Sequence, residues 1–190
     1  PIWAAMLANH CVSRGFGAQI LDCEAERLPI ATAAQQAIEF NARIICIVVY
    51  GQQPSASTQN MEGATRLSDE IKLRAPNSTI LFVGPHISAL PREVLKKHES
   101  INFICQNEGV YTISNLLSVP NLSEPNELKK IKGLGFRVED GTIVLNAPER
   151  IVPKALLGTD LPGMAWDLLP DLSKYRTAGW HSWPNKSAKS

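Results

Sequence analysis

The sequence predicts an α/β fold: a doubly wound parallel sheet, flavodoxin-like or Rossmann-like in layout, with a β-hairpin and an extended linker after it. Two observations predict this. Short apolar runs alternate four times with amphipathic segments of helical length. An Asp-Gly pair flanked by alternating apolar residues follows near the C-terminus. Because strand–helix–strand crossovers are right-handed, the alternating part is expected to form a parallel sheet with helices on both faces.

The first half of the chain supplies two helices and two strands. Residues 3–14 place apolar side chains at helical spacing, and a glycine-rich stretch ends that helix. Residues 18–23 (AQILDC) are short and apolar enough for a strand. Residues 29–40 form an alanine-rich amphipathic helix. Residues 43–50 (RIICIVVY) are apolar almost throughout, which is typical of a strand buried on both faces of a parallel sheet.

Five further elements continue the alternation after a polar loop at residues 51–60. One helix should end before Pro76, and another should begin at Pro91, where proline is favoured in the first helical turn. The strands and helices expected here are strands over 79–83 and 101–105, and helices over 61–75, 91–98 and 110–117.

The alternation opens on a helix, whereas folds of this class place a strand before the first helix, and that strand usually lies in the middle of the sheet. We therefore expect the first strand and its loop to lie upstream of Pro1.

The character of the sequence changes after residue 117. Residues 118–127 are polar and rich in turn formers, and the pattern of residues 133–146 predicts a hairpin around Asp140-Gly141. Residues 147–190 hold five of the 13 prolines and three of the four tryptophans, which favours an extended linker that packs on another surface. We expect an α/β domain over 1–120, and the hairpin and linker over 121–190.

Composition excludes several classes of function. A net charge of +1 without a basic cluster argues against nucleic-acid binding. No apolar run reaches the roughly 18 residues needed to cross a membrane. The four cysteines form no C-x-x-C pair, so we expect reduced, buried thiols in a cytoplasmic protein and no metal site. Phosphate-loop, nucleophile-elbow and zinc-protease motifs are absent from the sequence.

Three polar loops leave the carboxyl ends of predicted strands, where open α/β sheets bind ligands: 51–60, 84–88 and 106–109. Their neutral hydroxyl and amide groups suit a large ligand of little charge, and their glycines permit close backbone approach. A purely structural interpretation stands beside this one, because serine and threonine often cap helices and glycine often forms turns. Asp22 fits a ligand contact or a turn cap equally, and His10 is expected on a helix surface.

These loops and the segments downstream of them resemble the N-terminal cobalamin (B12)-binding domain of B12-dependent radical SAM proteins. The motifs that carry the resemblance are 83–86 (VGPH), 90–93 (LPRE), 107–109 (NEG) with Thr112, 131–137 (IKGLGFR), 140–141 with Asn146, and 161–162, 166–170 and 175–176. They cover nearly the whole chain in the order and spacing of that family.

The resemblance implies a domain that holds cobalamin with its nucleotide tail between sheet and helices. The residues that it assigns to the cofactor are Tyr50, Gly51, Ser55, Ser57, Thr58, Gln59, Gly84, Pro85, His86, Ser88, Glu108 and Gly109. It implies a radical SAM barrel in the same parent chain as partner. A [4Fe–4S] cluster and S-adenosylmethionine are expected only on that barrel, because no cysteine follows Cys105 here. The parent enzyme is expected to be a methyltransferase, and this chain alone is not expected to catalyse.

Three substitutions depart from the family's pattern: Pro85 and Asn107 stand where the family commonly has glycine, and Val110 stands where it has glutamate. Two alternatives stay open, and the first is motivated by Pro85 and Asn107. The first is a degenerate scaffold domain of a radical SAM enzyme that no longer binds cobalamin. The second is a flavodoxin-like module for a flavin or another nucleotide, which the same loops would accommodate.

Overall fold

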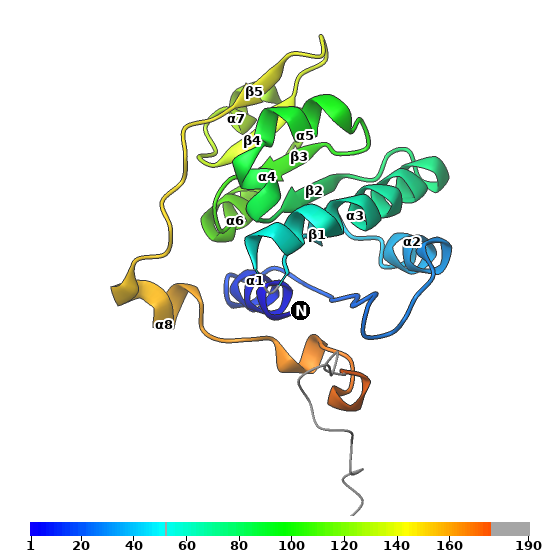
Figure 1. The fold of residues 1–190 in the computed structure, drawn as a ribbon. Coiled ribbons are helices and arrows are strands. Elements are labelled where there is room, and N and C mark those ends of the chain that lie inside the picture. Colours follow the sequence, from blue (N-terminus) through cyan, green and yellow to red (C-terminus); the bar gives the residue numbers. More distant parts are fainter. Residues whose placement is uncertain (52, 176–190) are drawn as a thin grey trace, which may run out of the picture.

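A five-stranded mixed sheet organises the computed structural model, which describes residues 1–51 and 53–175 (Figure 1). The strands lie in sequence order. They are β1 (Ile45–Val48), β2 (Ile80–Val83), β3 (Phe103–Cys105), β4 (Leu134–Arg137) and β5 (Ile143–Leu145). The first three are parallel, and the β4–β5 hairpin adds antiparallel to β3. The predicted α/β fold with a C-terminal hairpin is confirmed.

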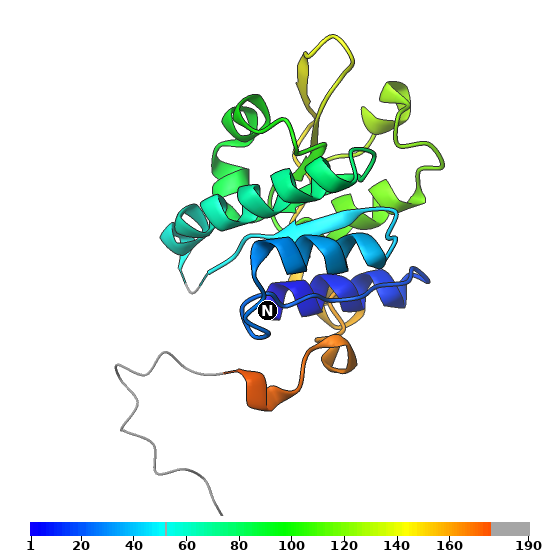
Figure 2. The ribbon, with the colours of Figure 1, turned by 90° about the vertical axis from the view of Figure 1, so that its right-hand side faces the viewer.

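Helices cover both faces of this sheet because alternate strand residues are apolar on both sides. One face carries α1 (Ile2–Ser13) and α6 (Val110–Ser118), whose side chains pack with Leu81, Val83 and Cys105. The opposite face packs against helices that follow one another along the chain. They are α2 (Ile30–Glu39), α3 (Pro54–Arg74), α4 (Pro85–Ala89) and α5 (Pro91–Lys97) (Figure 2).

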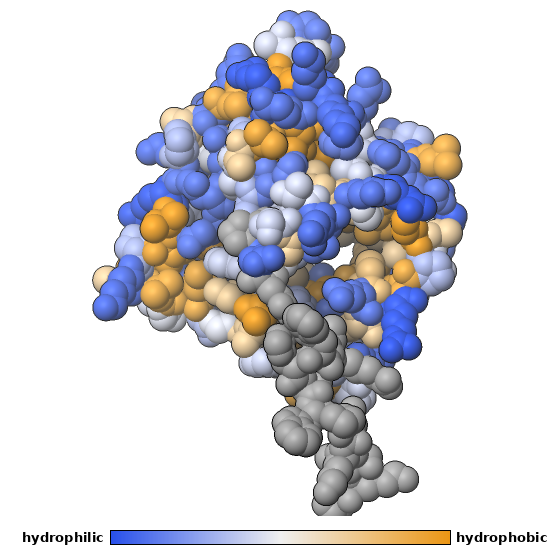
Figure 3. Space-filling view, in the orientation of Figure 1, coloured by the Kyte–Doolittle hydropathy of each residue, from blue (hydrophilic) through white to orange (hydrophobic). Residues whose placement is uncertain are grey.

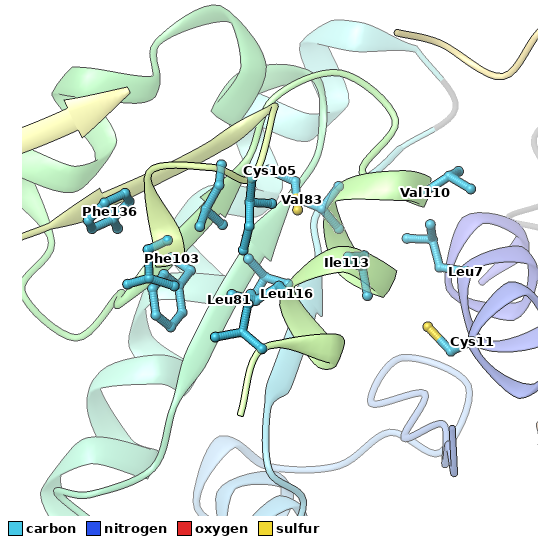
Figure 4. Close-up of a cluster of buried hydrophobic side chains, with 14 of the residues drawn as sticks. Leu7, Cys11, Leu81, Val83, Phe103, Cys105, Val110, Ile113, Leu116 and Phe136 are labelled. Carbon is cyan, nitrogen blue, oxygen red and sulfur yellow. The ribbon is translucent and has the colours of Figure 1, made fainter. Parts of the chain in front are cut away.

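The centre of the core lies under α1 and α6 (Figure 4). Leu7 and Cys11 of α1 meet Ile113 of α6 above side chains from β2, β3 and β4. All four residues of β2 are fully buried, because this strand has a strand on each side and helices on each face. Burial of this apolar surface is the main stabilising contribution to the fold.

The hairpin belongs to the same sheet, and Gly135 shows how closely it packs. A Cβ atom at this position would lie 2.6 Å from Cγ1 of Ile104 and 2.8 Å from Cδ2 of Leu145. A side chain there would force β3, β4 and β5 apart. A short helix, α7 (Pro125–Leu128), leads into the hairpin, and Asn146 ties the hairpin's end to it by donating to the Leu128 carbonyl oxygen at 2.7 Å.

The C-terminal arm, which we define as residues 147–175, turns back past α1 (Figures 1 and 2). It contains α8 (Leu157–Asp160) and three short 3₁₀ turns, Lys154–Leu156, Trp166–Leu168 and Leu172–Lys174. The Ala165 N–H donates to the Ala5 carbonyl oxygen at 3.1 Å. The described part of this segment, up to Tyr175, therefore packs on the domain itself. Arg176 and the rest of the predicted linker lie outside the described residues.

Several predicted element boundaries are wrong. The loop expected at 51–60 is helical from Pro54 onward, so α3 begins seven residues earlier than predicted. The next loop, 84–88, is mostly the short helix α4. Proline occupies the first turn of both helices, where its fixed φ favours helix and its missing N–H costs nothing. Both segments are polar enough that their sequences predict loops. Their burial depends on tertiary contacts, which a local sequence pattern does not reveal.

Two strand predictions also need correction. Residues 18–23 form no strand, because no other strand lies beside them to share hydrogen bonds. Residues 45–48 do form β1, but all four side chains are only half-buried, since β1 is the edge strand of the sheet. Within the described part of the chain, none of the helices combines the length and apolar character that a membrane span requires.

Candidate functional site

The three parallel strands end side by side, which brings the predicted loops together at one edge of the sheet. Tyr50 and Gly51 follow β1, Gly84 follows β2, and residues 106–109 follow β3. We call this region the carboxyl edge. Its two halves, the β1–α3 half and the β3–α6 half, differ in what their polar groups already bind.

Ser57 connects the ends of β1 and β2. Its side chain is fully buried, and Oγ donates to the Val49 carbonyl oxygen at 2.6 Å. Ser57 Oγ also accepts from the His86 backbone N–H at 3.2 Å. The hydroxyl therefore donates and accepts within the protein, so Ser57 positions α3 and α4.

Other polar residues of the first turns of α3 face outward. Ser55, Thr58 and Gln59 are all exposed. Thr58 Oγ1 forms a hydrogen bond of 3.0 Å with His86 Nδ1, and this pair joins α3 to α4 at the surface. Ser55, Thr58 and Gln59 form a neutral, solvent-accessible set that can donate and accept hydrogen bonds.

The glycines of the carboxyl edge allow protein segments to approach one another. A Cβ atom on Gly84 would lie 2.2 Å from the Val49 carbonyl oxygen, and φ there is +157°. A Cβ atom on Gly51 would lie 2.2 Å from that of Ala56. Gly109 has φ of +77° and begins α6, with Val83 Cγ2 2.9 Å from the position of a Cβ. Packing between strands and helices thus requires glycine at these sites.

The β3–α6 half is covered by the C-terminal arm. Glu108 Oε2 accepts from the Val152 N–H at 2.9 Å, and Asn107 Nδ2 donates to the Glu149 carbonyl oxygen at 2.7 Å. Ser88 Oγ donates to the Asn107 carbonyl oxygen at 3.4 Å. Asn107 adopts φ of +58°, a conformation that asparagine tolerates better than most residues. No local sequence pattern indicates that Asn107 and Glu108 bind the arm, because the arm residues that make these bonds are 42 and 44 positions downstream.

Trp3 and Tyr50 stack at the end of β1, with ring centroids 4.9 Å apart and an interplanar angle of 27°. Burial raises the pKa of the Tyr50 phenol to about 12, and the nearby Glu108 carboxylate and thiols act in the same direction. Tyr50 is therefore a neutral hydroxyl at physiological pH. Asn60 Nδ2 donates to the Tyr50 carbonyl oxygen at 3.0 Å. The sequence pattern places Trp3 on a helix but does not bring Trp3 or Asn60 to this edge.

The structure decides two predictions outside the carboxyl edge. Asp22 caps a turn: Oδ1 accepts from the Ala25 N–H at 3.1 Å, and Oδ2 accepts from the Tyr175 hydroxyl at 3.0 Å. The expectation that His10 lies at the surface is wrong. His10 is fully buried, and its Nδ1 donates to the Asp160 carbonyl oxygen at 2.6 Å.

Two cavities of the described structure lie away from the carboxyl edge. A polar, open cavity of about 500 Å³ lies between residues 25–28, α2 and the end of the arm, and none of the residues assigned to the cofactor lines it. Across residues 1–51 and 53–175, no three histidine, cysteine or acidic side chains are grouped so that they could hold a metal ion. The four cysteines are free.

Comparison with known proteins gives a consistent result. The model of the B12 binding domain family matches residues 1–117, more than half of the chain. An uncharacterized methyltransferase of Pyrococcus horikoshii is 27% identical over 179 residues, 94% of this chain and 36% of its own length. The anaerobic magnesium-protoporphyrin IX monomethyl ester cyclase of Synechocystis is 24% identical over 179 residues, 94% of this chain and 33% of its own. This chain thus spans about a third of these relatives.

Solved structures share the fold. The cobalamin-dependent S-adenosylmethionine radical enzyme OxsB, with aqua-cobalamin and S-adenosylmethionine bound, superimposes with a TM-score of 0.67. The match has 18% sequence identity and covers 88% of this chain and 22% of that enzyme. The apo form of the same enzyme gives a TM-score of 0.63 at 17% identity, over 87% of this chain and 21% of that one.

Proposed function

This chain belongs to the B12-binding domain family, and from that membership we propose that it holds cobalamin against the carboxyl edge of β1 and β2. The observation that carries the proposal is the exposed, neutral polar set on the first turns of α3, beside the Trp3–Tyr50 pair. In this proposal residues 1–120 bind the cofactor, and residues 121–190 supply the hairpin and the linker.

The side chains present fit this cofactor. Cobalamin carries neutral amide groups around its corrin ring and a nucleotide tail, so its recognition calls for uncharged donors and acceptors and an aromatic or apolar wall. Ser55, Thr58 and Gln59 supply the uncharged donors and acceptors. Trp3 and Tyr50 supply the aromatic wall. The Glu108 carboxylate is engaged by the Val152 N–H, which lowers the cost of placing a neutral ligand nearby.

The remaining assigned residues have shaping roles in this proposal. Gly51, Gly84 and Gly109 let the strand ends and helices come together, and Ser57 fixes α3 against α4. Pro85 begins α4 and thereby places His86 beside Thr58. Ser88 binds the backbone of residue 107, and Glu108 binds the backbone of residue 152 in the arm. Both bonds hold the carboxyl edge in place.

Bound cobalamin would supply cobalt-centred chemistry such as methyl transfer, while this chain would bind and orient it. We propose a parent enzyme with a radical SAM barrel that carries the [4Fe–4S] cluster and S-adenosylmethionine. The names of the similar proteins support this: one is a methyltransferase and one a cobalamin-dependent radical enzyme. Four free thiols support a reducing, cytoplasmic location.

An absorbance titration with hydroxocobalamin, followed by gel filtration, tests the proposal. We expect a corrinoid spectrum that elutes with the protein, and about tenfold weaker binding when Gln59→Ala and Thr58→Ala are combined. Gln35→Ala, an exposed glutamine on α2, is the matched control and should bind as the unchanged chain does. A colourless protein peak from correctly folded chain contradicts the proposal and favours the scaffold alternative. Flavin that elutes with the protein instead identifies the flavodoxin-like alternative.

A further inference from the structure

A buried histidine of α1 lies against the C-terminal arm. His10 is fully buried, and its Nδ1 lies 2.6 Å from the Asp160 carbonyl oxygen. Because a carbonyl oxygen only accepts, the ring proton is on Nδ1. The other ring nitrogen, Nε2, is also buried and has no hydrogen-bond partner among the described residues. The neutral ring fits this position, whereas a protonated ring would carry a second N–H with nothing to bind.

The groups that face His10 offer no acceptor to a protonated ring. The Asp160 carboxylate is already engaged: Oδ2 accepts from the Tyr111 hydroxyl at 2.5 Å, and Oδ1 accepts from Arg14 Nη2 at 3.0 Å. The Tyr111 ring of α6 stands edge-on to His10, with centroids 6.3 Å apart. Arg150 of the arm lies over that phenol ring, 5.0 Å from its centroid. A charged imidazole would thus be buried beside two arginines and one carboxylate whose oxygens are occupied.

The same surroundings set the proton affinity of the ring. Burial lowers the pKa of His10; the bond to the Asp160 carbonyl oxygen opposes this, the Arg14 charge adds to it, and the Asp160 carboxylate opposes it. An exposed histidine has a pKa of about 6.5. Any state in which the ring reaches water therefore binds a proton more readily than the docked state does.

The arm has few contacts that would resist such a state. Within residues 147–175 the buried side chains are those of Val152, Asp160 and Ala165, while Ile151 and Leu157 remain 62% and 44% exposed. Figure 3 shows apolar side chains at the surface in the region of α8. Segments with little buried surface open locally at a lower free energy than the core does. The sheet, in contrast, has the fully buried strand β2 at its centre.

We propose that His10 is an acid-sensitive latch for the arm: protonation of its ring releases residues 147–165 from α1 and α6 while the sheet stays folded. Release lets the charged ring reach water. It also frees Glu108 at the carboxyl edge, because the Val152 N–H that Glu108 Oε2 accepts moves away with the arm. Proton uptake on α1 thereby changes the exposure of the β3–α6 half. The latch belongs to the fold and does not depend on a bound cofactor.

Hydrogen–deuterium exchange of this chain at pH 7.5 and pH 5.5 tests the latch, with rates expressed as protection factors so that the chemical exchange rate at each pH cancels. The reporters are the Val152 and Ala165 amides, which bind the arm to the domain. Because His10 titrates as an exposed ring once the arm is open, we expect reporter protection to fall about three- to tenfold between these pH values. At both, it should stay at least about tenfold below that of the Val49 and Asn102 amides, which donate to β2.

Two asparagine variants separate the latch from other titrations. His10→Asn places an amide nitrogen where Nδ1 donates and has no ionisable ring, so the reporters should lose their pH dependence. His98→Asn is the matched control. Burial also lowers the pKa of His98, but this residue ends α5 on the opposite face of the sheet. The reporters should respond to pH in His98→Asn as they do in the unchanged chain.

Three results would overturn the proposal: reporter protection that is the same at both pH values, pH dependence that persists in His10→Asn, and equal protection of the reporters and the β2-paired amides at pH 5.5. The last would mean that the arm opens only when the whole domain unfolds. If His10→Asn does not fold, an NMR titration of the His10 ring in the unchanged chain replaces it. Reporter protection should then fall only between about pH 6.5 and the midpoint of that titration, and a fall outside this window would exclude His10. Because none of these readouts involves cobalamin, the proposed function can fail separately.

Discussion

The two halves of the carboxyl edge present the same kinds of residue in different states. In the β1–α3 half, Ser55, Thr58 and Gln59 are exposed, and only Thr58 has a side-chain partner among the described residues. In the β3–α6 half, Asn107 and Glu108 are bound to residues 149 and 152 of the arm. Similar polar residues are thus open to solvent in one half, where we propose the ligand surface, and bound to the arm in the other. Variants that affect one half alone should separate stability from cofactor affinity.

The largest effect is expected at Gly84, which packs closely against the end of β1. In Gly84→Ala the new methyl group would collide with the Val49 carbonyl oxygen at a φ that alanine rarely adopts. We expect the free energy of unfolding to fall by about 3 kcal/mol in urea denaturation. Gly63→Ala is the control: Gly63 lies within α3 with nothing near its Cβ position, so stability should rise by about 0.5–1 kcal/mol. Equal stability of the two variants would contradict this account.

The next effect distinguishes two serines of the β1–α3 half. Ser57→Ala removes the buried hydroxyl between Val49 and His86 and should cost about 2 kcal/mol in unfolding free energy. Ser55→Ala changes an exposed residue and should leave stability within about 0.5 kcal/mol while weakening cobalamin binding. Urea denaturation and cofactor titration on both variants measure this. A stable Ser57→Ala would show that the hydroxyl is not the connection between α3 and α4.

A pH-dependent effect is expected where the arm meets α1. Burial lowers the pKa of His10, with the Arg14 charge acting in the same direction and the Asp160 carbonyl and carboxylate opposing. The folded state therefore binds fewer protons than the unfolded state, whose pKa is about 6.5. Stability should be constant above that pH and fall below it, by at most about 1.4 kcal/mol per pH unit. Urea denaturation from pH 8 to 5 checks this, and His10→Gln should flatten the profile.

The smallest effect is expected in the β3–α6 half. Glu108→Ala removes the acceptor for the Val152 N–H, which should cost about 1 kcal/mol and speed exchange of that amide. Cobalamin affinity should change less than in the Gln59→Ala and Thr58→Ala pair. Glu108→Gln retains an acceptor oxygen and is the control. A larger loss of affinity in Glu108→Ala than in that pair would reverse the comparison between the two halves.

Local signals predict the parts of this molecule that local chemistry determines. Runs such as residues 79–83 and 101–105 are apolar enough to be strands in any α/β context, and the Asp140-Gly141 turn predicts its hairpin directly. The strand prediction for residues 18–23 is wrong because a strand depends on a neighbour. Ser57 and Glu108 lie at the predicted edge, but their internal partners, Val49 and Val152, depend on tertiary packing that no spacing rule contains.

Contacts between α1 and the arm join the two ends of the described chain. The Ala165 N–H pairs with the Ala5 carbonyl oxygen, and His10 pairs with Asp160, 150 residues away. Closing a loop of this length is slow and entropically costly, so these pairs should form late in folding. During synthesis α1 leaves the ribosome well before the arm, so its contacts with the arm cannot form until the arm has been made. Until those contacts form, this helix, which carries no charged residue, leaves apolar surface open to solvent.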